Sequence, residues 1–206
     1  IEEIPRGTLG ENEVLIRAMS GEVWHDLVSF TTDRGYWGIE NLSLIPGTVG
    51  GAPVQNIGAY GAELKDVLES VEAYSVEDGS KRIFTKEECE LGYRDSIFKN
   101  RLKGQYFISA ITLKLNKISK PNISYKILSE FLKEKNIEVK TPGDISDAVT
   151  AIRKTRLPDS SVISNAGSFF KNIFVSEEKL KELLGKYPDM PYFKESKDIK
   201  IPSAWR

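Results

Sequence analysis

Residues 45–61 combine glycine, proline and apolar side chains in a way that could bind a phosphate group. The stretch reads IPGTVGGAPVQNIGAYG and holds five glycines and two prolines, a density that no regular element tolerates. Because glycine has no Cβ, successive backbone N–H groups can point at one anion and approach it closely. This glycine-rich segment contains neither GxxxxGK[ST] nor GxGxxG. From glycine content alone, a tightly turned connection between strands is an equally weighted alternative.

The segment at 92–99, GYRDSIFK, places an arginine directly before an aspartate. A guanidinium is planar and permanently charged, so Arg94 could bind a carboxylate through two parallel hydrogen bonds. The alternative is a surface ion pair between Arg94 and Asp95, which would contribute little to stability. Without further context the alternative is favoured, because most charged side chains are solvated.

The segment at 165–172, NAGSFFKN, contains a serine that stands apart from any histidine in the sequence. The only histidine of the chain, His25, is expected beside Trp24 on a helix and in a structural role. A hydrolytic triad around Ser168 is therefore unsupported. The alternative for this serine is structural, with Gly167 turning the chain and a phenylalanine entering the core.

Composition and charge exclude several kinds of partner. The 206 residues carry a formal net charge of -1, so no strong field attracts nucleic acid or an acidic membrane surface. No apolar run approaches the length that spans a bilayer. The single cysteine, Cys89, excludes an internal disulfide and fits a reducing compartment. These features favour an ordinary globular protein without a nucleic-acid or membrane partner.

Hydrophobic periodicity predicts the elements that must position these segments. A strand-rich part comes first, and a helical part follows from about residue 119. In the strand-rich part we expect a strand over 14–18, a helix over 24–31 with a stop at Gly35, and a hairpin over 71–84 with its turn at Asp78-Gly79. A further strand is expected in which these residues share one face: Phe107, Ser109, Ile111, Leu113 and Leu115. In the helical part we expect a helix over 127–132, a break at 141–144, and helices over 145–152 and 180–184, the last one capped by Ser176 and stopped by Gly185.

Together the three segments resemble motifs of the FAD-dependent UDP-N-acetylenolpyruvoylglucosamine reductases. Residues 45–61 are similar to the second flavin-binding segment of that family, and a match over so long a run is very specific. GYRDSIFK is similar to a motif whose arginine contacts the enolpyruvyl carboxylate of the substrate, and NAGSFFKN to one whose serine donates a proton. The resemblance runs from about Ile16 to Trp205 and indicates the subclass that has a mobile-loop tyrosine.

The resemblance implies an α+β fold with an FAD-binding domain of the vanillyl-alcohol-oxidase/PCMH-like type. Residues 1–118 would belong to that domain, residues 119–143 to a connecting segment with the loop tyrosine, and residues 144–206 to a smaller α+β substrate-binding domain. It also implies that an earlier glycine-rich flavin loop and a late glutamate of the family lie outside this chain. We therefore expect the chain as it stands to bind FAD poorly and to turn over little.

The resemblance implies a role for each site residue and no metal site. Arg94 would stabilise negative charge at the carboxylate, and Ser168 would act as the general acid. The residues implied to hold FAD are Ile45, Pro46, Gly47, Thr48, Val49, Gly50, Gly51, Gln55, Asn56, Ile57, Gly58, Ala59, Tyr60 and Gly61. The residues implied to bind the substrate are Tyr125, Arg156, Lys171, Asn172 and Tyr192.

Some of these positions have alternatives of equal or similar weight. Tyr125 could equally be a half-buried aromatic residue at the start of a helix. The basic cluster of Arg153, Lys154 and Arg156 suits a UDP pyrophosphate, but cations near a helix C-terminus also interact favourably with the macrodipole. The family often has lysine at the position of Arg156 and proline at the position of Ile173, and neither difference changes the interpretation.

The implied reaction is a two-stage, NADPH-dependent reduction in peptidoglycan precursor synthesis, carried out by a cytoplasmic monomer. NADPH would reduce the flavin and leave. The enolpyruvyl UDP-sugar would then accept hydride at its vinyl carbon and a proton from Ser168 at the adjacent carbon. Two alternatives stay open: a different FAD-dependent oxidoreductase, which would lack the pairing of Arg94 with Ser168, and a non-catalytic remnant that acts only as a binding module.

Overall fold

The computed structural model describes residues 1–5, 10–156, 158, 162–164, 170–195 and 198–202. The chain divides into two compact units, Ile1–Leu157 and Pro158–Arg206, and each is described by itself. Among the described residues, no helix has both the length and the apolar character needed to cross a membrane.

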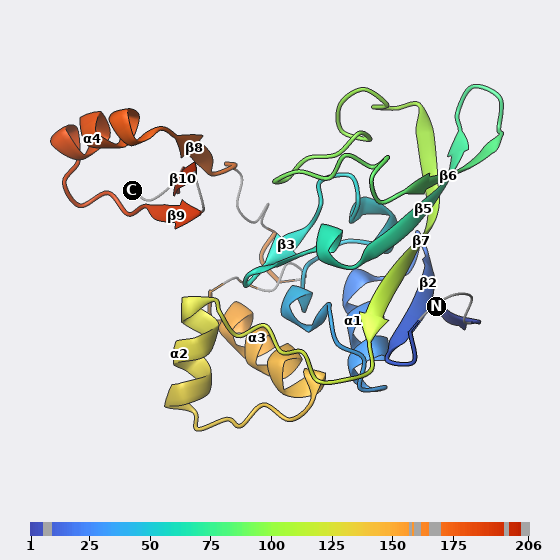
Figure 1. Ribbon diagram of the computed structural model, residues 1–206, viewed down its shortest axis with the longest axis horizontal. Coiled ribbons are helices and arrows are strands. Elements are labelled where there is room, and N and C mark those ends of the chain that lie inside the picture. Colours follow the sequence, from blue (N-terminus) through green and yellow to red (C-terminus); the bar gives the residue numbers. More distant parts are fainter. Residues whose placement is uncertain (6–9, 157, 159–161, 165–169, 196–197, 203–206) are drawn as a thin grey trace. The chain divides into compact units, whose positions relative to one another are not determined.

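The first unit is built on a five-stranded antiparallel sheet (Figure 1). The strand order is β1 (Glu2–Ile4), β2 (Glu13–Met19), β7 (Tyr106–Asn116), β5 (Leu68–Ser75) and β6 (Lys81–Thr85). Alternate residues of β2 are buried as the sequence predicts, because successive side chains of a strand point to opposite faces. The expected hairpin over 71–84 is formed by β5 and β6.

The inner face of the sheet packs against α1 (Trp24–Thr32) in one large apolar core. Trp24, Leu27 and Val28 of the helix are buried there, as their helical spacing predicts. The helix ends at Thr32, and Gly35 follows with φ of 74°, the left-handed turn that a glycine accommodates most easily.

The prediction that one face of β7 runs from Phe107 to Leu115 is wrong at its beginning. Ile111, Leu113 and Leu115 are buried, whereas Phe107 is 64% exposed and Ile108 is buried instead. The pairing of β5 with β7 shifts register at this point, so a bulge turns the start of the strand over. The sequence pattern alone contains no sign of that extra residue.

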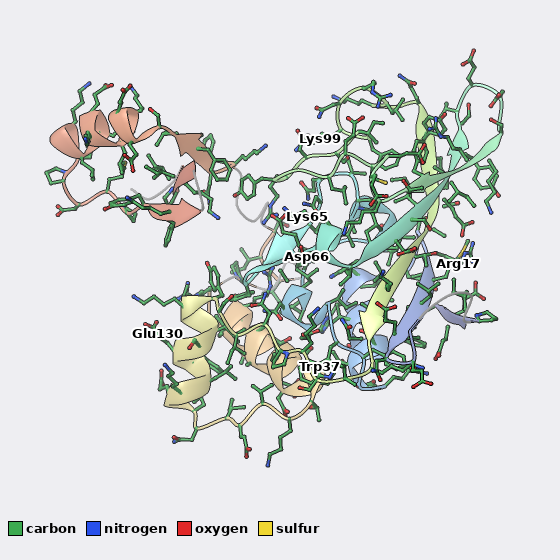
Figure 2. All side chains as sticks on the ribbon, in the orientation of Figure 1. Arg17, Trp37, Lys65, Asp66, Lys99 and Glu130 are labelled. Carbon is green, nitrogen blue, oxygen red and sulfur yellow. The ribbon has the colours of Figure 1, made fainter. Side chains whose placement is uncertain are left out.

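Two further helices, α2 (Lys126–Glu134) and α3 (Pro142–Arg156), pack side by side around a second apolar cluster (Figure 1). Trp37, labelled in Figure 2, belongs to this cluster. The expected break at 141–144 is the beginning of α3, where Asp144 accepts from the Thr141 backbone N–H at 2.7 Å and donates its own N–H to the Thr141 Oγ1.

The glycine-rich segment forms only short regular pieces, in agreement with a density of glycine and proline that no longer regular element tolerates. These pieces and those beside them are η1 (Glu40–Leu42), η2 (Val49–Gly51), β3 (Gly58–Ala59), β4 (Ala62–Glu63) and η3 (Leu64–Asp66). Residues with positive φ recur along the segment and give it its turns: Leu44, Gly47, Asn56, Tyr60 and Gly61.

The second unit contains β8 (Ile173–Val175), α4 (Glu177–Lys186), β9 (Phe193–Glu195) and β10 (Asp198–Ile201), with the strands in the order β8-β10-β9. Leu180, Met190, Ile199 and Ile201 form its buried cluster. Ser176 caps α4 as predicted, because its side chain accepts from the Lys179 N–H. The prediction that Gly185 stops this helix is wrong, since α4 continues to Lys186.

The two compact units divide the chain after Leu157, behind the end of α3. Ser146 on α3 hydrogen-bonds Ser43 across 2.8 Å, and the helix contacts α1 and η1 of the first unit. The resemblance instead implies a division at residue 144, with residues 144–206 grouped by their role in substrate binding. That assignment by role stays a prediction.

Candidate functional site

The glycine-rich segment is fixed by backbone hydrogen bonds to residues at and just before the start of α1. Trp24 donates its N–H to the Gly47 carbonyl at 3.0 Å, and Val49 donates to the Glu22 carbonyl at 2.9 Å. The Gly50 N–H donates to the Ser20 carbonyl at 3.0 Å. The N–H groups of Val49 and Gly50 are thus used within the fold, so the row of N–H groups open to an anion is shorter than expected.

Gly47 and Thr48 form the part of the segment that remains open to an anion. Both residues are exposed, and among the described residues their backbone N–H groups have no acceptor. Gly47 has φ of 112°, a conformation that favours glycine, and a Cβ there would meet nothing within 4 Å. Two adjacent free N–H groups on an exposed turn can bind one anionic oxygen.

Gly50 is required for packing. A Cβ at this position would lie 2.7 Å from the Ser20 Cβ, so a larger residue would push the segment away from its support. Gly51, next to it, is exposed and has open space around it. Neighbouring glycines of one motif therefore serve different purposes.

A hollow of about 490 Å³ with a mixed polar and apolar lining adjoins the open part of the segment. Its lining comes from Ser20 and Gly21 after β2, from Thr48, Gly50 and Val54 of the segment, and from Phe98 with residues around the start of β7. An anion site next to an apolar and aromatic wall suits a ligand that carries both phosphate and a ring system.

Leu44, directly before the segment, is held by side chains from two helices. Its N–H donates to His25 Nδ1 at 3.1 Å, and its carbonyl accepts from Arg153 Nε at 3.2 Å. Leu44 has φ of 55°, which is unusual for a residue with a branched side chain. His25 thus has the structural role that the sequence predicts. Burial lowers the pKa of Arg153.

Asn56 ties the segment to the GYRDSIFK turn. It is buried, and its Nδ2 donates to Glu63 Oε2 at 3.0 Å and to the Gly92 carbonyl at 2.8 Å. Its Oδ1 accepts from the Lys65 N–H at 2.9 Å. Because these bonds occupy both donors of the side chain and its acceptor, Asn56 is placed to shape the segment.

Arg94 lies at the tip of a two-residue turn and reaches the glycine-rich segment. Gly92 and Asp95 exchange backbone hydrogen bonds of 3.0 and 3.2 Å, and Arg94 between them has φ of 53°. Its guanidinium donates to the carbonyls of Asn56 and Gly58. The fold therefore brings together two of the three sequence segments, which are more than thirty residues apart in the chain.

The arginine is not engaged with the neighbouring aspartate. Asp95 accepts from the Ser96 N–H and from Asn100 Nδ2, and the described residues include no ion pair of Arg94 with Asp95. A guanidinium has five N–H donors, and two of them bind carbonyl oxygens here. The remaining three have no acceptor among the described residues and could donate to a carboxylate.

Tyr60, at the end of the segment, contacts Tyr125 and lies within electrostatic reach of Arg156, two of the residues expected to bind substrate. Its ring meets that of Tyr125 edge to face, with centroids 5.5 Å apart. Burial raises the pKa of Tyr60, and the nearby charges of Arg153 and Arg156 oppose that rise. Tyr125 and Arg156 are both exposed, one before α2 and the other in the last turn of α3.

All predicted FAD residues belong to the first unit, and four other predicted site residues, Ser168, Lys171, Asn172 and Tyr192, belong to the second. Ser168 lies outside the described residues. Lys171 and Asn172 directly precede β8, and Tyr192, 42% exposed, directly precedes β9.

Three residues near the site were not found by sequence reasoning: Asn41, Glu63 and Asn122. Asn41 is buried and donates through Nδ2 to the carbonyls of Tyr60 and Asn122. Its position shortly before the glycine-rich segment is the only signal in the sequence that could have indicated it.

Comparison with known proteins places these observations in one family. A model of the FAD binding domain matches residues 7–83. Curated UDP-N-acetylenolpyruvoylglucosamine reductases match nearly the whole chain: that of Amoebophilus asiaticus is 47% identical over 203 residues and that of Neisseria gonorrhoeae 44% identical over 207, which is 96% and 100% of this chain. In each case the chain spans 59% of the relative's length.

A solved structure supports the same fold. The UDP-N-acetylenolpyruvylglucosamine reductase of Thermus caldophilus aligns with a TM-score of 0.56 at 22% sequence identity, over 93% of this chain and 63% of that one. At that identity the likeness concerns the fold alone, which is an FAD-binding domain of the PCMH-like type with mixed helices and sheets. Sequence and fold agree that the chain belongs to the UDP-N-acetylenolpyruvoylglucosamine reductase family and spans a little under three fifths of the length of the curated relatives that it matches.

Proposed function

We propose that the protein is an FAD-dependent oxidoreductase that reduces UDP-N-acetylenolpyruvoylglucosamine to UDP-N-acetylmuramate with NADPH, in peptidoglycan precursor synthesis. The observation that carries the proposal is the position of Arg94, whose guanidinium is held on the carbonyls of Asn56 and Gly58 in the glycine-rich segment. A carboxylate-binding group is thereby fixed on the segment that the family uses for its flavin.

The chemistry of the glycine-rich segment fits FAD. The open N–H groups of Gly47 and Thr48 suit a phosphate oxygen of the cofactor, and the hollow beside Val54 offers an apolar wall to a ring. Gly58 allows a close approach, since a Cβ there would lie 2.9 Å from Arg94 Nη1. When bound, FAD would carry hydride from NADPH to the substrate.

The role proposed for Arg94 follows from its charge and its free donors. Negative charge would develop toward the enolpyruvyl carboxylate as hydride arrives, and a positioned guanidinium stabilises that charge most as it forms. Ser168 would then donate a proton to the adjacent carbon. In this proposal Tyr125, Arg156, Lys171, Asn172 and Tyr192 bind the UDP-sugar.

The proposal also covers the domain organisation, the cellular location and the oligomeric state of the protein. Residues 1–118 would form the FAD-binding part, residues 119–143 the connection with the loop tyrosine, and residues 144–206 the substrate-binding part. The enzyme would act in the cytoplasm as a monomer, as the resemblance implies, and size-exclusion chromatography with light scattering would test the oligomeric state.

The test uses the chain extended at both ends to the length of its relatives. NADPH absorbance is followed with and without UDP-N-acetylenolpyruvoylglucosamine, for the wild type and for Arg94→Ala and Ser168→Ala. Arg101→Ala is the matched control, because Arg101 is an exposed arginine of the same region that pairs with Glu90. We expect substrate-dependent oxidation to fall about 100- to 1,000-fold in Arg94→Ala and to stay unchanged in Arg101→Ala.

Each outcome of this test distinguishes one function. If Ser168→Ala abolishes substrate-dependent oxidation while NADPH still reduces the flavin, the proton donor is identified. Flavin reduction that no enolpyruvyl substrate accelerates would instead indicate a different FAD-dependent oxidoreductase. A protein that binds no flavin would support the non-catalytic alternative.

A further inference from the structure

Asn41 joins two segments that are far apart in the sequence. It is 1% exposed, and its Nδ2 donates to the carbonyl of Tyr60 and to the carbonyl of Asn122, both at 2.8 Å. An asparagine amide has two N–H donors, and these two hydrogen bonds use both of them. One acceptor ends the glycine-rich segment, and the other begins residues 122–125, which we call the tyrosine segment.

Asn122 also donates a hydrogen bond to the glycine-rich segment, and we call the contacts of Asn41, Tyr60, Gly61, Asn122 and Ser124 the joint. Its Nδ2 donates to the Gly61 carbonyl at 2.9 Å, and its Oδ1 accepts from the Ser124 Oγ at 2.8 Å. The backbones lie so close that a Cβ on Gly61 would be 3.6 Å from Asn122 Nδ2 and 3.5 Å from Ser124 Oγ. The two segments are therefore joined by side-chain amides from both sides.

The joint fixes the point from which Tyr125 projects. Tyr125 directly follows Ser124 and precedes α2, and its ring meets the Tyr60 ring at a centroid distance of 5.5 Å. A displacement of the Tyr60 carbonyl would therefore displace Asn41 and Asn122, and with them the backbone that carries Tyr125. The Asn41 side chain is buried, so breaking its two hydrogen bonds would leave its amide without partners, whereas the Asn122 bonds lie at the surface.

We infer that Asn41 and Asn122 are positioning residues that hold the end of the flavin-binding segment and the tyrosine segment as one unit, so that Tyr125 is presented to a UDP-sugar bound at the flavin. The inference rests on the proposed function for the roles of the two segments. Neither asparagine need touch cofactor or substrate. Their effect on substrate binding passes through Tyr125.

The first test measures the joint itself and needs no ligand. Amide hydrogen exchange is followed in the chain as it stands, for the wild type, Asn41→Ala and Asn122→Ala. Asn12→Ala is the matched control, since Asn12 is an exposed asparagine outside the joint. We expect exchange to accelerate together in residues 60–62 and 122–126 in both joint variants, and to stay unchanged in the control. If only one of the two stretches is loosened, the segments are not held as one unit and the inference is wrong.

The second test separates positioning from general destabilisation. In the chain extended to the length of its relatives, Asn122→Ala should raise the KM for the UDP-sugar about tenfold, with kcat and FAD affinity unchanged. Asn122 is half-buried, so this variant avoids the cost of truncating the fully buried Asn41. The same substitution in a Tyr125→Ala background should have no further effect on KM, because the positioned group is gone.

Additive effects of Asn122→Ala and Tyr125→Ala would overturn the inference, since they would show that the asparagine does not act through the tyrosine. A wild-type protein without substrate-dependent oxidation would instead refute the proposed function. The exchange measurement on the joint would still be decisive in that case, so failure of the inference and failure of the function are distinguished.

Discussion

The imidazole of His25 accepts a hydrogen bond at Nδ1 from the backbone N–H of Leu44, 3.1 Å away, and so supports a residue with positive φ at the entrance of the glycine-rich segment. The contact joins the first turn of α1 to the segment. We therefore expect the hydrogen-bond acceptor at this position to contribute more to stability than the rest of the imidazole ring.

Substitution of His25 tests this contact. His25→Leu should lower the free energy of unfolding by about 1–2 kcal/mol, because the Leu44 N–H loses its partner. His25→Asn should restore most of the loss, because asparagine Oδ1 stands at the same number of bonds from Cα as Nδ1. Urea unfolding of both variants checks the difference, and equal losses would contradict the prediction.

Acid should weaken the sheet through Glu72. Hydrogen bonds from Arg17, opposed by burial and aided by Lys81, lower the pKa of Glu72 from 4.5 to about 2. A carboxyl whose pKa is lower in the folded state contributes stability above its unfolded pKa and loses it as pH falls through the folded value. That contribution is on the order of 3 kcal/mol and should disappear between pH 4.5 and about 2.

The Glu72→Gln variant should therefore have a flatter dependence of stability on pH in that window. Urea unfolding at a series of pH values measures it. Glu69→Gln is the control, because Glu69 is exposed and its ion pair with Lys114 is 3.9 Å long. If the wild type and Glu72→Gln lose stability in parallel below pH 4.5, the ion pair with Arg17 is not the cause.

Gly50 and Gly51 offer a matched pair for the packing of the glycine-rich segment. A Cβ on Gly50 would lie 2.7 Å from the Ser20 Cβ, whereas one on Gly51 would meet nothing within 4 Å. Gly50→Ala should cost about 1–3 kcal/mol, and Gly51→Ala should leave stability unchanged or slightly higher. Thermal unfolding compares them. A similar loss in both would mean that backbone conformation, and not contact with Ser20, requires the glycines.

Gly185 should be replaceable with a gain in stability. It lies exposed inside α4, and a Cβ there would have open space. Gly185→Ala should therefore stabilise the helix by about 0.5–1 kcal/mol. Amide exchange within α4 measures the gain locally, and faster exchange in the variant would show that the glycine is needed.

Elements whose signals are local could be predicted from the sequence. The alternation in β2 and the spacing in α1 indicate these elements, and the cap at Ser176 correctly indicates the start of α4. The error at Gly185 arose because one glycine costs a helix little when the leucine pattern before it is strong. The bulge that exposes Phe107 depends on pairing with β5, which lies more than thirty residues earlier and leaves no trace in the local pattern.

The candidate site divides in the same way. The types of residue that could bind phosphate and carboxylate were visible in the sequence, and Arg94 does reach the glycine-rich segment. Its acceptors are backbone carbonyls, which every residue has, so no sequence pattern could indicate them. Asn41 was missed because asparagine is also common in turns, so the sequence does not distinguish a buried amide that joins two loops from an ordinary turn residue.

The short turn that carries Arg94 also bears on the entropy of binding. A free arginine side chain samples many rotamers and loses about 2 kcal/mol of entropy when it is immobilised. Here the carbonyls of Asn56 and Gly58 already restrict the guanidinium in the folded chain. The Arg94 side chain is therefore ordered during folding and not on binding. Further immobilisation of the guanidinium would reduce the affinity for a carboxylate ligand very little.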